Sequence, residues 1–271
     1  MRATDFIYDG VQLSSLGYIV CTFDSGGTDS SSAGSEITFN SVKQHGGVYY
    51  AQTGTEYEQC FSATFSICRD ITDGPGQEIS LADYRKLMRW LNRRQLHDFV
   101  LIDPKEVGWK DITFQGSFNV EKIEFSGNII GLNLTFNTNR PFGVGKATTV
   151  AFSIESANGT YSITNDSDEI GVLYPDLFEI TCKQDGDLTI TNNPEGRVTF
   201  IAGCTSGEKV TMDCANQIIT SSLASHKKIY NDFNFTFFRL YNSYSERVNV
   251  VTFSMPCDVK IVYRPVRKVV F

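Results

Sequence analysis

The chain has 271 residues, of which 41% are hydrophobic and 20% are charged, and its formal net charge is -7. This composition can build large apolar cores and is unlike that of a disordered or collagenous chain. The net negative charge argues against specific nucleic-acid binding, because phosphates are repelled at long range.

The seven cysteines are odd in number and form no Cys-x-x-Cys pair. Most lie in apolar, strand-like runs, which predicts buried, reduced thiols rather than a disulfide scaffold. The first five residues lack the apolar segment of a signal peptide, and no apolar run reaches membrane-spanning length. We therefore expect synthesis in a cytoplasm and no membrane insertion.

The N-terminal part predicts short strands and turns. Asp9-Gly10 separates two apolar runs and is a two-residue hairpin signal. A Ser/Gly-rich loop is expected at 24–35, where no apolar residue anchors the chain. Apolar residues alternate with polar ones from Phe61 to Ile67, as in a half-buried strand. Further strands are expected at 16–23, 37–39, 48–51 and 99–102, with a turn at 45–47 between the second and third.

Helical periodicity occurs only within residues 79–101. Ser80 is suited to cap the first turn, and Asp83 follows three residues later, in a weaker form of the capping box. We expect one amphipathic helix packed against β-sheet, with a buried stripe at helical spacing. That predicted stripe consists of Leu81, Tyr84, Leu87, Met88 and Leu91.

The opposite side of this helix is predicted to be basic, with Arg94 and Trp90 on its flank. A charged helix face is commonly a solvated surface. The alternative is a docking surface for an acidic partner or for nucleic acid. The candidate assembly residues are Arg85, Lys86, Arg89 and Arg93.

Strand 130–136 ends the first half, and the run 139–145, with Pro141 and two glycines, is the expected domain boundary. The second half has no trusted helical segment. Its short strands and frequent turns predict an all-β sandwich. The expected strands lie at 150–154, 161–163, 177–182, 188–191, 198–201, 209–214, 217–220, 233–240, 248–253 and 259–263.

No motif for catalysis, cofactor binding or metal binding is found. Gly143-Val-Gly145-Lys146 lacks the first Gly and the Ser or Thr of a phosphate-binding loop. The three histidines are far apart in the sequence, without the spacing of a zinc site. The acidic clusters at 166–169 and 185–187 lie beside turn residues, which explains them. We expect no enzyme activity and no cofactor.

A saccharide site was weighed for the second half of the chain. β-Sandwich lectins stack sugars on aromatic side chains, but both tryptophans, Trp90 and Trp109, lie in the first half. Tyr241 and Tyr244 are the candidates for saccharide contact, because most other aromatic residues there alternate within predicted strands.

Several short segments together resemble one family. The segments that carry the resemblance are Leu16-Gly-Tyr-Ile-Val20, Ile67-Cys68, Arg89-Trp-Leu-Asn92, Phe114-Gln-Gly-Ser-Phe-Asn-Val120, Leu134-Thr-Phe136, Pro141-Phe-Gly143, Ile190-Thr-Asn-Asn193, Gly207-Glu-Lys-Val210, Asp213-Cys214, Ile218-Ile-Thr-Ser-Ser222, Tyr230-Asn-Asp-Phe-Asn234 and Tyr263-Arg-Pro-Val-Arg-Lys-Val269. In their order and spacing the chain resembles the distal tail (Dit) proteins of siphophages and prophages of Gram-positive bacteria.

The resemblance implies a mainly β fold with two domains. Residues 1–143 would form an N-terminal β-sandwich with one α-helix, and residues 144–271 a C-terminal galectin-like β-sandwich. Six N-terminal domains would form a ring, the hub of the tail tip in the virion, assembled in the bacterial host cytoplasm.

The ring would join the tail tube protein to the tail-associated lysin or tail fibre protein of the host-adsorption apparatus, and DNA would pass through its lumen. Two alternatives stay open: a carbohydrate-binding module for a host cell-wall saccharide, and a wall hydrolase.

Overall fold

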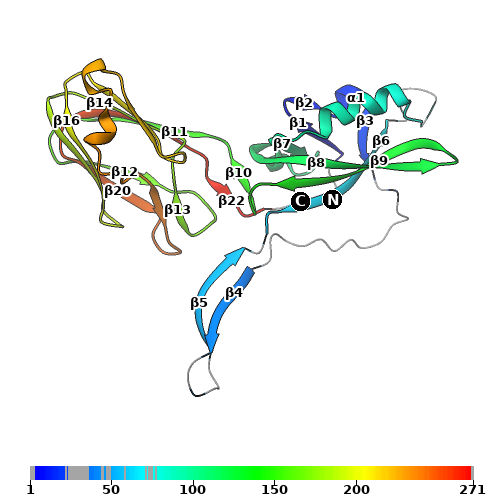
Figure 1. Ribbon diagram of the computed structural model, residues 1–271, viewed down its shortest axis with the longest axis horizontal. Coiled ribbons are helices and arrows are strands. Elements are labelled where there is room, and N and C mark those ends of the chain that lie inside the picture. Colours follow the sequence, from blue (N-terminus) through cyan, green and yellow to red (C-terminus); the bar gives the residue numbers. More distant parts are fainter. Residues whose placement is uncertain are drawn as a thin grey trace. The chain divides into compact units, whose positions relative to one another are not determined.

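The computed structural model describes residues 4–21, 23, 37–43, 46, 50–57, 59–70, 72, 76 and 78–269. The chain divides into two compact units, drawn in Figure 1. Unit 1 contains Met1–Val144 and Arg267–Phe271, and unit 2 contains Gly145–Val266. The loop expected at 24–35 lies outside the described residues.

Unit 1 is built on one antiparallel sheet. Its strand order is β2-β1-β7-β8-β9-β6-β3, and β10 and β22 are attached to it. The backbone N–H of Val20, in β3, donates to the carbonyl oxygen of Thr4 at 3.0 Å, just before β1. The sheet therefore curls so that its edge strand β3 comes close to β1. The strands are β1 (Asp5–Tyr8), β2 (Val11–Gln12), β3 (Tyr18–Cys21), β6 (Ser62–Arg69), β7 (His97–Ile102), β8 (Ile112–Phe125), β9 (Asn128–Thr138), β10 (Gly143–Gly145) and β22 (Val266–Arg267).

The hairpin predicted at the N-terminus is confirmed. Asp9 and Gly10 have φ angles of 50° and 73°, as a type I′ turn requires, and the turn joins β1 to β2. The 139–145 run was expected to be irregular, but its last three residues form β10.

The core of unit 1 is rich in aromatic side chains. Phe6, Phe99, Phe118 and Phe136 are fully buried, and the rings of Phe99 and Phe136 are 4.6 Å apart. Phe118 and Phe136 alternate along their strands with polar residues on the other side of the sheet, so the period-two pattern of β8 and β9 produces this part of the core face.

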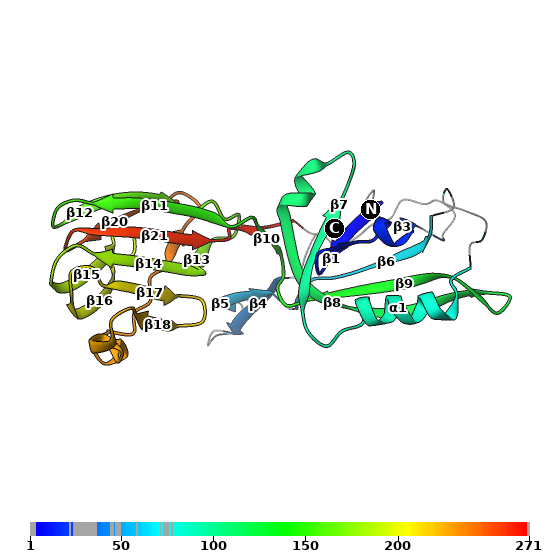
Figure 2. The same cartoon turned by 90° about the horizontal axis from the view of Figure 1, so that it is seen from above.

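Helix α1 (Leu81–Leu91) lies along one face of the sheet, over β8 and β9, as Figures 1 and 2 both show. The Oγ of Ser80 accepts a hydrogen bond from the N–H of Asp83 at 3.1 Å, which confirms the predicted cap. The buried face of α1 is rotated around the helix axis from the stripe that the sequence predicted. Trp90 is buried with Leu87 and Leu91, whereas Leu81 is 69% exposed. Since successive residues are about 100° apart, Leu81 lies about 150° around the helix from a stripe centred between Leu87 and Trp90, on the exposed side.

Unit 2 is the predicted galectin-like β-sandwich. Its two antiparallel sheets have the orders β11-β21-β14-β17-β18 and β12-β20-β15-β16, and β13 pairs with β19. Buried residues from both sheets form one apolar core. The strands are β11 (Thr148–Ile154), β12 (Gly159–Thr164), β13 (Gly171–Leu173), β14 (Leu177–Cys182), β15 (Gly186–Asn192), β16 (Arg197–Cys204), β17 (Lys209–Asp213), β18 (Ile218–Ser221), β19 (Leu240–Asn242), β20 (Val248–Phe253) and β21 (Cys257–Tyr263).

One predicted strand in unit 2 is wrong. The 233–240 segment is irregular up to Leu240, and short 3-10 helices at Ala224–His226 and Ile229–Asn231 precede it. The segment fails as a regular strand because Phe235 has a left-handed φ of 55°.

Candidate assembly surfaces

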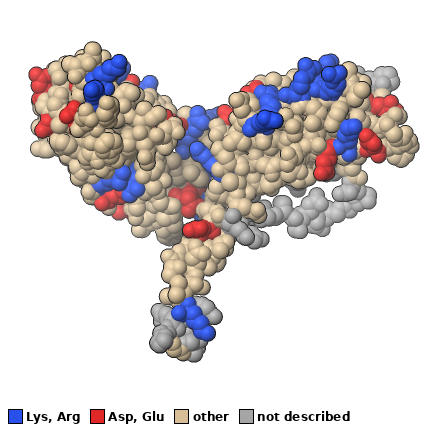
Figure 3. Space-filling model, viewed as in Figure 1, with Lys and Arg blue, Asp and Glu red and all other residues tan. Residues whose placement is uncertain are grey.

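The exposed side of α1 carries three of the four basic residues predicted there. Arg85, Lys86 and Arg89 are exposed, and Figure 3 shows Lys and Arg side chains gathered over this helix. The Nζ of Lys86 lies 3.3 Å from Oδ1 of Asp83, one turn away. The Nε of Arg89 donates to the carbonyl oxygen of Arg85 at 3.4 Å. These three basic residues are called the basic helix face below.

Arg93 lies elsewhere, because α1 ends at Leu91. Its Nη1 is 2.7 Å from Oδ2 of Asp9, and its Nε donates to the carbonyl oxygen of Trp90 at 2.8 Å. The hydrogen bond from Arg93 holds the pKa of the Asp9 carboxyl below its usual range. Arg93 therefore joins the end of the helix to the first hairpin turn and is not part of the basic helix face.

A second surface is the two-stranded sheet of β4 (Ile37–Lys43) and β5 (Tyr50–Tyr57), visible as a separate hairpin in Figure 1. Within the described residues it pairs with no other strand. Ile37, Phe39 and Val42 are each half exposed or more. Strand β4 is therefore exposed on both sides and carries apolar side chains that the described residues of its own unit do not cover.

The base of this hairpin is anchored in unit 1. The ring of Tyr57 meets that of Phe142 edge-on, with 5.0 Å between centroids. The Nζ of Lys268 lies 5.9 Å and 5.6 Å from the centroids of these two rings, within cation–π range. The C-terminal residues thus help to fix the position from which the hairpin starts.

The sequence interpretation found these strands in part, at 37–39 and 48–51, but missed their exposure. Alternation of apolar and polar residues predicts a half-buried strand, so nothing in the sequence signalled that both sides of β4 are exposed.

A third surface is the outward side of β6, β8 and β9. Neighbouring side chains there bond to one another: Thr64 and Thr135 have their hydroxyl oxygens 3.2 Å apart, and Ser62 donates to Asn137 at 3.2 Å. Eight outward residues in this central part carry a hydroxyl or an amide group, and the acidic Glu121 of β8 adjoins them, paired with Asn133. This polar sheet face consists of Ser62, Thr64, Ser66, Ser117, Asn119, Asn133, Thr135 and Asn137.

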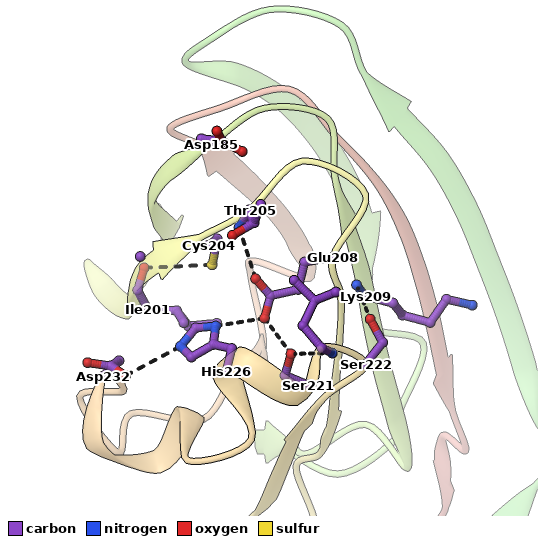
Figure 4. Close-up of polar contacts among 12 residues, drawn as sticks. Asp185, Ile201, Cys204, Thr205, Glu208, Lys209, Ser221, Ser222, His226 and Asp232 are labelled. Atoms are coloured by element: carbon purple, nitrogen blue, oxygen red, sulfur yellow. Dashed lines mark hydrogen bonds and ion pairs between the residues drawn. The ribbon is translucent and has the colours of Figure 1, made fainter.

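Unit 2 holds one buried titratable cluster, drawn in Figure 4. The Oε1 of the fully buried Glu208 lies 2.7 Å from Nδ1 of His226 and accepts a hydrogen bond from Oγ of Ser221 at 2.5 Å. The Nε2 of His226 lies 3.4 Å from Oδ2 of Asp232. Since Ser221 bonds to the carboxylate and not to the imidazole, the arrangement does not activate a nucleophile. It ties the 3-10 helices to β18.

His226 was interpreted from the sequence as an isolated histidine. Its partner Glu208 lies 18 residues earlier, in the turn before β17. No spacing rule connects the two, because their contact depends on how this connection folds back over the sheet.

The two candidate saccharide residues differ in their surroundings. Tyr241 lies in β19, partly buried, and its N–H donates to Oδ1 of Asn249 at 2.7 Å. Tyr244 follows in a turn and is 93% exposed. Saccharide binding by these residues stays a prediction.

All seven cysteines are free thiols, and Cys182, Cys204, Cys214 and Cys257 are buried. Burial raises the pKa of Cys214 and of Cys257 to about 12. Such thiols are inert apolar groups, not nucleophiles.

Across the described part of the chain, no three His, Cys, Asp or Glu side chains are grouped to hold a metal ion. No helix among the described residues is both long enough and apolar enough to cross a membrane.

The fold defines a two-unit, mainly β protein whose distinctive features are surfaces rather than a reactive centre. A family model described as the N-terminal domain of a phage tail protein matches residues 1–140, and one described as a phage tail C-terminal domain matches residues 142–263. The chain therefore belongs to this family of phage tail proteins. It is a component of the virion tail and associates with other tail proteins.

A solved structure agrees with this assignment at the level of the fold. The Dit protein of phage SPP1, described as a paradigm of the hub adsorption apparatus in phages that infect Gram-positive bacteria, superposes with a TM-score of 0.63. The match covers 97% of this chain and 99% of the SPP1 protein, at 12% sequence identity. The resemblance to distal tail proteins is confirmed for the fold. No protein with a curated description matches the chain.

Proposed function

We propose that this protein is the hub of the tail tip, a ring of six copies that links the tail tube protein to the tail-associated lysin or fibre and takes part in host adsorption. The role is structural and non-enzymatic. Unit 1 forms the ring, and unit 2 forms the galectin-like domain; the boundary expected after residue 143 is kept, but Arg267–Phe271 belong to unit 1. Assembly takes place in the cytoplasm of the bacterial host.

The observation that carries this proposal is the β4–β5 hairpin. A lone two-stranded hairpin is at best marginally stable in water. This one also leaves Ile37, Phe39 and Val42 in solvent. Burying apolar surface contributes about 25 cal/mol per Å², so a neighbouring copy that covered these side chains would stabilise both the hairpin and the contact. An arm on each copy that contacts the next copy makes a heterologous interface, which generates a ring when the rotation between copies closes.

The polar sheet face supports the assignment of a lumen. DNA-binding surfaces contact phosphates mainly through Lys and Arg. The eight residues of this face are neither Lys nor Arg, three cross-strand pairs of them bond to one another, and the adjoining Glu121 is acidic. A surface of this kind would allow a DNA duplex to pass without binding it. We therefore propose that this face lines the inside of the ring.

The basic helix face is assigned to a partner. Arg85, Lys86 and Arg89 would meet an acidic surface of an adjoining tail protein. Replacing Arg85 and Arg89 by Glu should leave thermal unfolding unchanged, because both side chains are exposed. It should lower incorporation into tails. The same double reversal at Lys227 and Lys228 in unit 2 is the control, and equal loss with both pairs would contradict the assignment.

The ring itself is tested with hairpin variants of the full chain. The triple change Ile37→Ser, Phe39→Ser and Val42→Ser should abolish hexamers in native mass spectrometry while the monomer keeps its unfolding temperature. The matched control changes Ile218 and Val248 to Ser, since both are exposed apolar residues of unit 2. Hexamers that persist in the triple variant would refute the role of the hairpin.

A further inference from the structure

The irregular segment before β19 contains an unusual backbone conformation. Five non-glycine residues of the described chain have positive φ, and four of them are Asp9, Ser126, Asn158 and Gln217, which are polar residues in turns. The fifth is Phe235, with φ of 55°. A bulky side chain in the left-handed region is a genuine outlier, because its Cβ crowds the following carbonyl oxygen.

The side chain of Asn234 holds this conformation in place. Its Oδ1 accepts hydrogen bonds from the N–H groups of Phe200 at 3.2 Å and Thr236 at 3.1 Å. Its Nδ2 donates to the carbonyl oxygen of Val198 at 2.9 Å. The segment is thereby fixed to the edge strand β16, and Phe235 is presented in one orientation.

Burial of the Phe235 side chain within unit 2 does not offset the backbone strain at this residue. The side chain is 68% exposed, although its ring centroid lies 5.8 Å from that of Phe233. A glycine or an asparagine would adopt the same backbone with less strain. Strained residues that the surrounding structure holds in place are typical of binding sites, so the ring has a use outside this unit.

The chemistry around the ring indicates what kind of partner it meets. Sugar sites combine an aromatic surface with convergent polar groups that are free to bind hydroxyls. Here both side-chain polar atoms of Asn234 are bonded within the chain, and the Oγ1 of Thr236 donates to the Asn234 carbonyl oxygen at 3.4 Å. Val198, whose carbonyl bonds to Asn234, is itself an exposed apolar residue. The surface is an apolar knob and suits an apolar pocket.

We infer that Phe235 is an anchor residue that inserts into an apolar pocket of a different tail protein. The inference rests on the proposed role in the tail, but not on the hairpin, which lies in unit 1. An aromatic side chain held rigidly before binding loses little conformational freedom on docking, which is the property of a binding hot spot.

The first test measures the strain. Phe235→Asn and Phe235→Gly should raise the unfolding temperature of unit 2 by about 2 to 6 °C, since they relieve a left-handed backbone. Tyr244→Asn is the control, because Tyr244 is an exposed aromatic residue without positive φ, and it should give no rise. A lower unfolding temperature for both Phe235 variants would overturn the argument from strain.

The second test identifies the partner in assembled tails. The photoreactive analogue p-benzoylphenylalanine, placed at position 235 of the full chain, should give a covalent product with another tail protein, identified by mass spectrometry. The same analogue at position 244 should give none. No product from position 235, or a product with this chain alone, would refute the inference.

A third measurement separates this inference from its alternative and from the ring. Purified Phe235→Asn protein should form hexamers as the wild type does. Loss of hexamers in the variant alone would mean that Phe235 contacts another copy and would overturn the inference, whereas failure of both proteins to form hexamers would count against the hub. Purified host wall polysaccharide should bind neither protein. Polysaccharide binding that Phe235→Asn abolished would overturn the assignment to a protein partner.

Discussion

The indole Nε1 of Trp90 donates a hydrogen bond to the backbone carbonyl of Tyr8 at 3.1 Å. The Trp90 ring also stacks on Phe6, with centroids 5.8 Å apart and planes inclined by 12°. Residues 82 positions apart in the sequence are thus joined where α1 meets the first strand. This contact rotates the buried face of the helix away from the predicted stripe.

The rotated face gives a prediction for the helix. Leu87→Ala should lower the free energy of unfolding of unit 1 by about 2–5 kcal/mol, because Leu87 is buried and its removal leaves a cavity. Leu81→Ala should change it by no more than about 0.5 kcal/mol, because Leu81 is on the surface. Denaturant titration measures both values. Similar losses from the two variants would mean that the helix packs as first predicted from the sequence.

Gly116 is where β8 leaves no room for a side chain. A Cβ there would overlap the backbone oxygen of Asn137 and lie 2.6 Å from the Phe136 ring. Gly116→Ala should therefore destabilise unit 1 by about 2 kcal/mol or more, since neither neighbour can retreat from a packed core. Gly108→Ala, where a Cβ meets nothing within 4 Å, should be nearly neutral. Thermal unfolding distinguishes them, and a neutral Gly116 variant would show that the two strands are less tightly packed.

His226 is the partner of a fully buried carboxylate. His226→Ala should destabilise unit 2 by about 1–3 kcal/mol, because it removes one partner of the fully buried Glu208 side chain and leaves only the bonds from Ser221 and Thr205. Asp232→Asn, on the exposed side of the same imidazole, should cost about 1 kcal/mol or less. The comparison uses denaturant unfolding of the full chain. If Asp232→Asn lowered the free energy of unfolding more than His226→Ala did, the contact between His226 and Asp232 would be the more important one for stability.

The buried thiols give a prediction about pH. The pKa of Cys214 and of Cys257 is raised to about 12 in the folded protein, above the ordinary value of 9.0. Their contribution to stability is therefore complete below about pH 9 and is lost as the pH rises toward 12.

Near neutral pH, Ellman's reagent should react readily with the exposed Cys60 but with Cys214 and Cys257 only after unfolding. Mass spectrometry of the labelled peptides identifies the sites. Rapid labelling of Cys257 in the native protein would contradict its burial.

Local patterns predicted much of the fold. The Asp9-Gly10 turn, the Ser80 cap and the alternation of Phe61–Ile67 depend on neighbours in the sequence, so they could be predicted correctly. The orientation of α1 could not, because the hydrogen bond from Trp90 to Tyr8 depends on tertiary packing. The strand expected at 233–240 failed for a similar reason, since side-chain bonds from Asn234 to β16 replace a regular ladder.

The candidate surfaces were predicted less completely than the fold. Arg85, Lys86 and Arg89 follow from helical periodicity alone. Arg93 does not, because the helix ends before it and its guanidinium turns to Asp9. The exposure of Phe39 depends on the absence of a covering element, which no local pattern records.

The central claim is that copies of this chain close into a ring through unit 1. Negative-stain electron microscopy of the purified full chain at high concentration tests it most directly. We expect class averages with six-fold symmetry and a central opening. Isolated monomers that form no rings, even when the tail tube protein is added, would contradict the proposed ring.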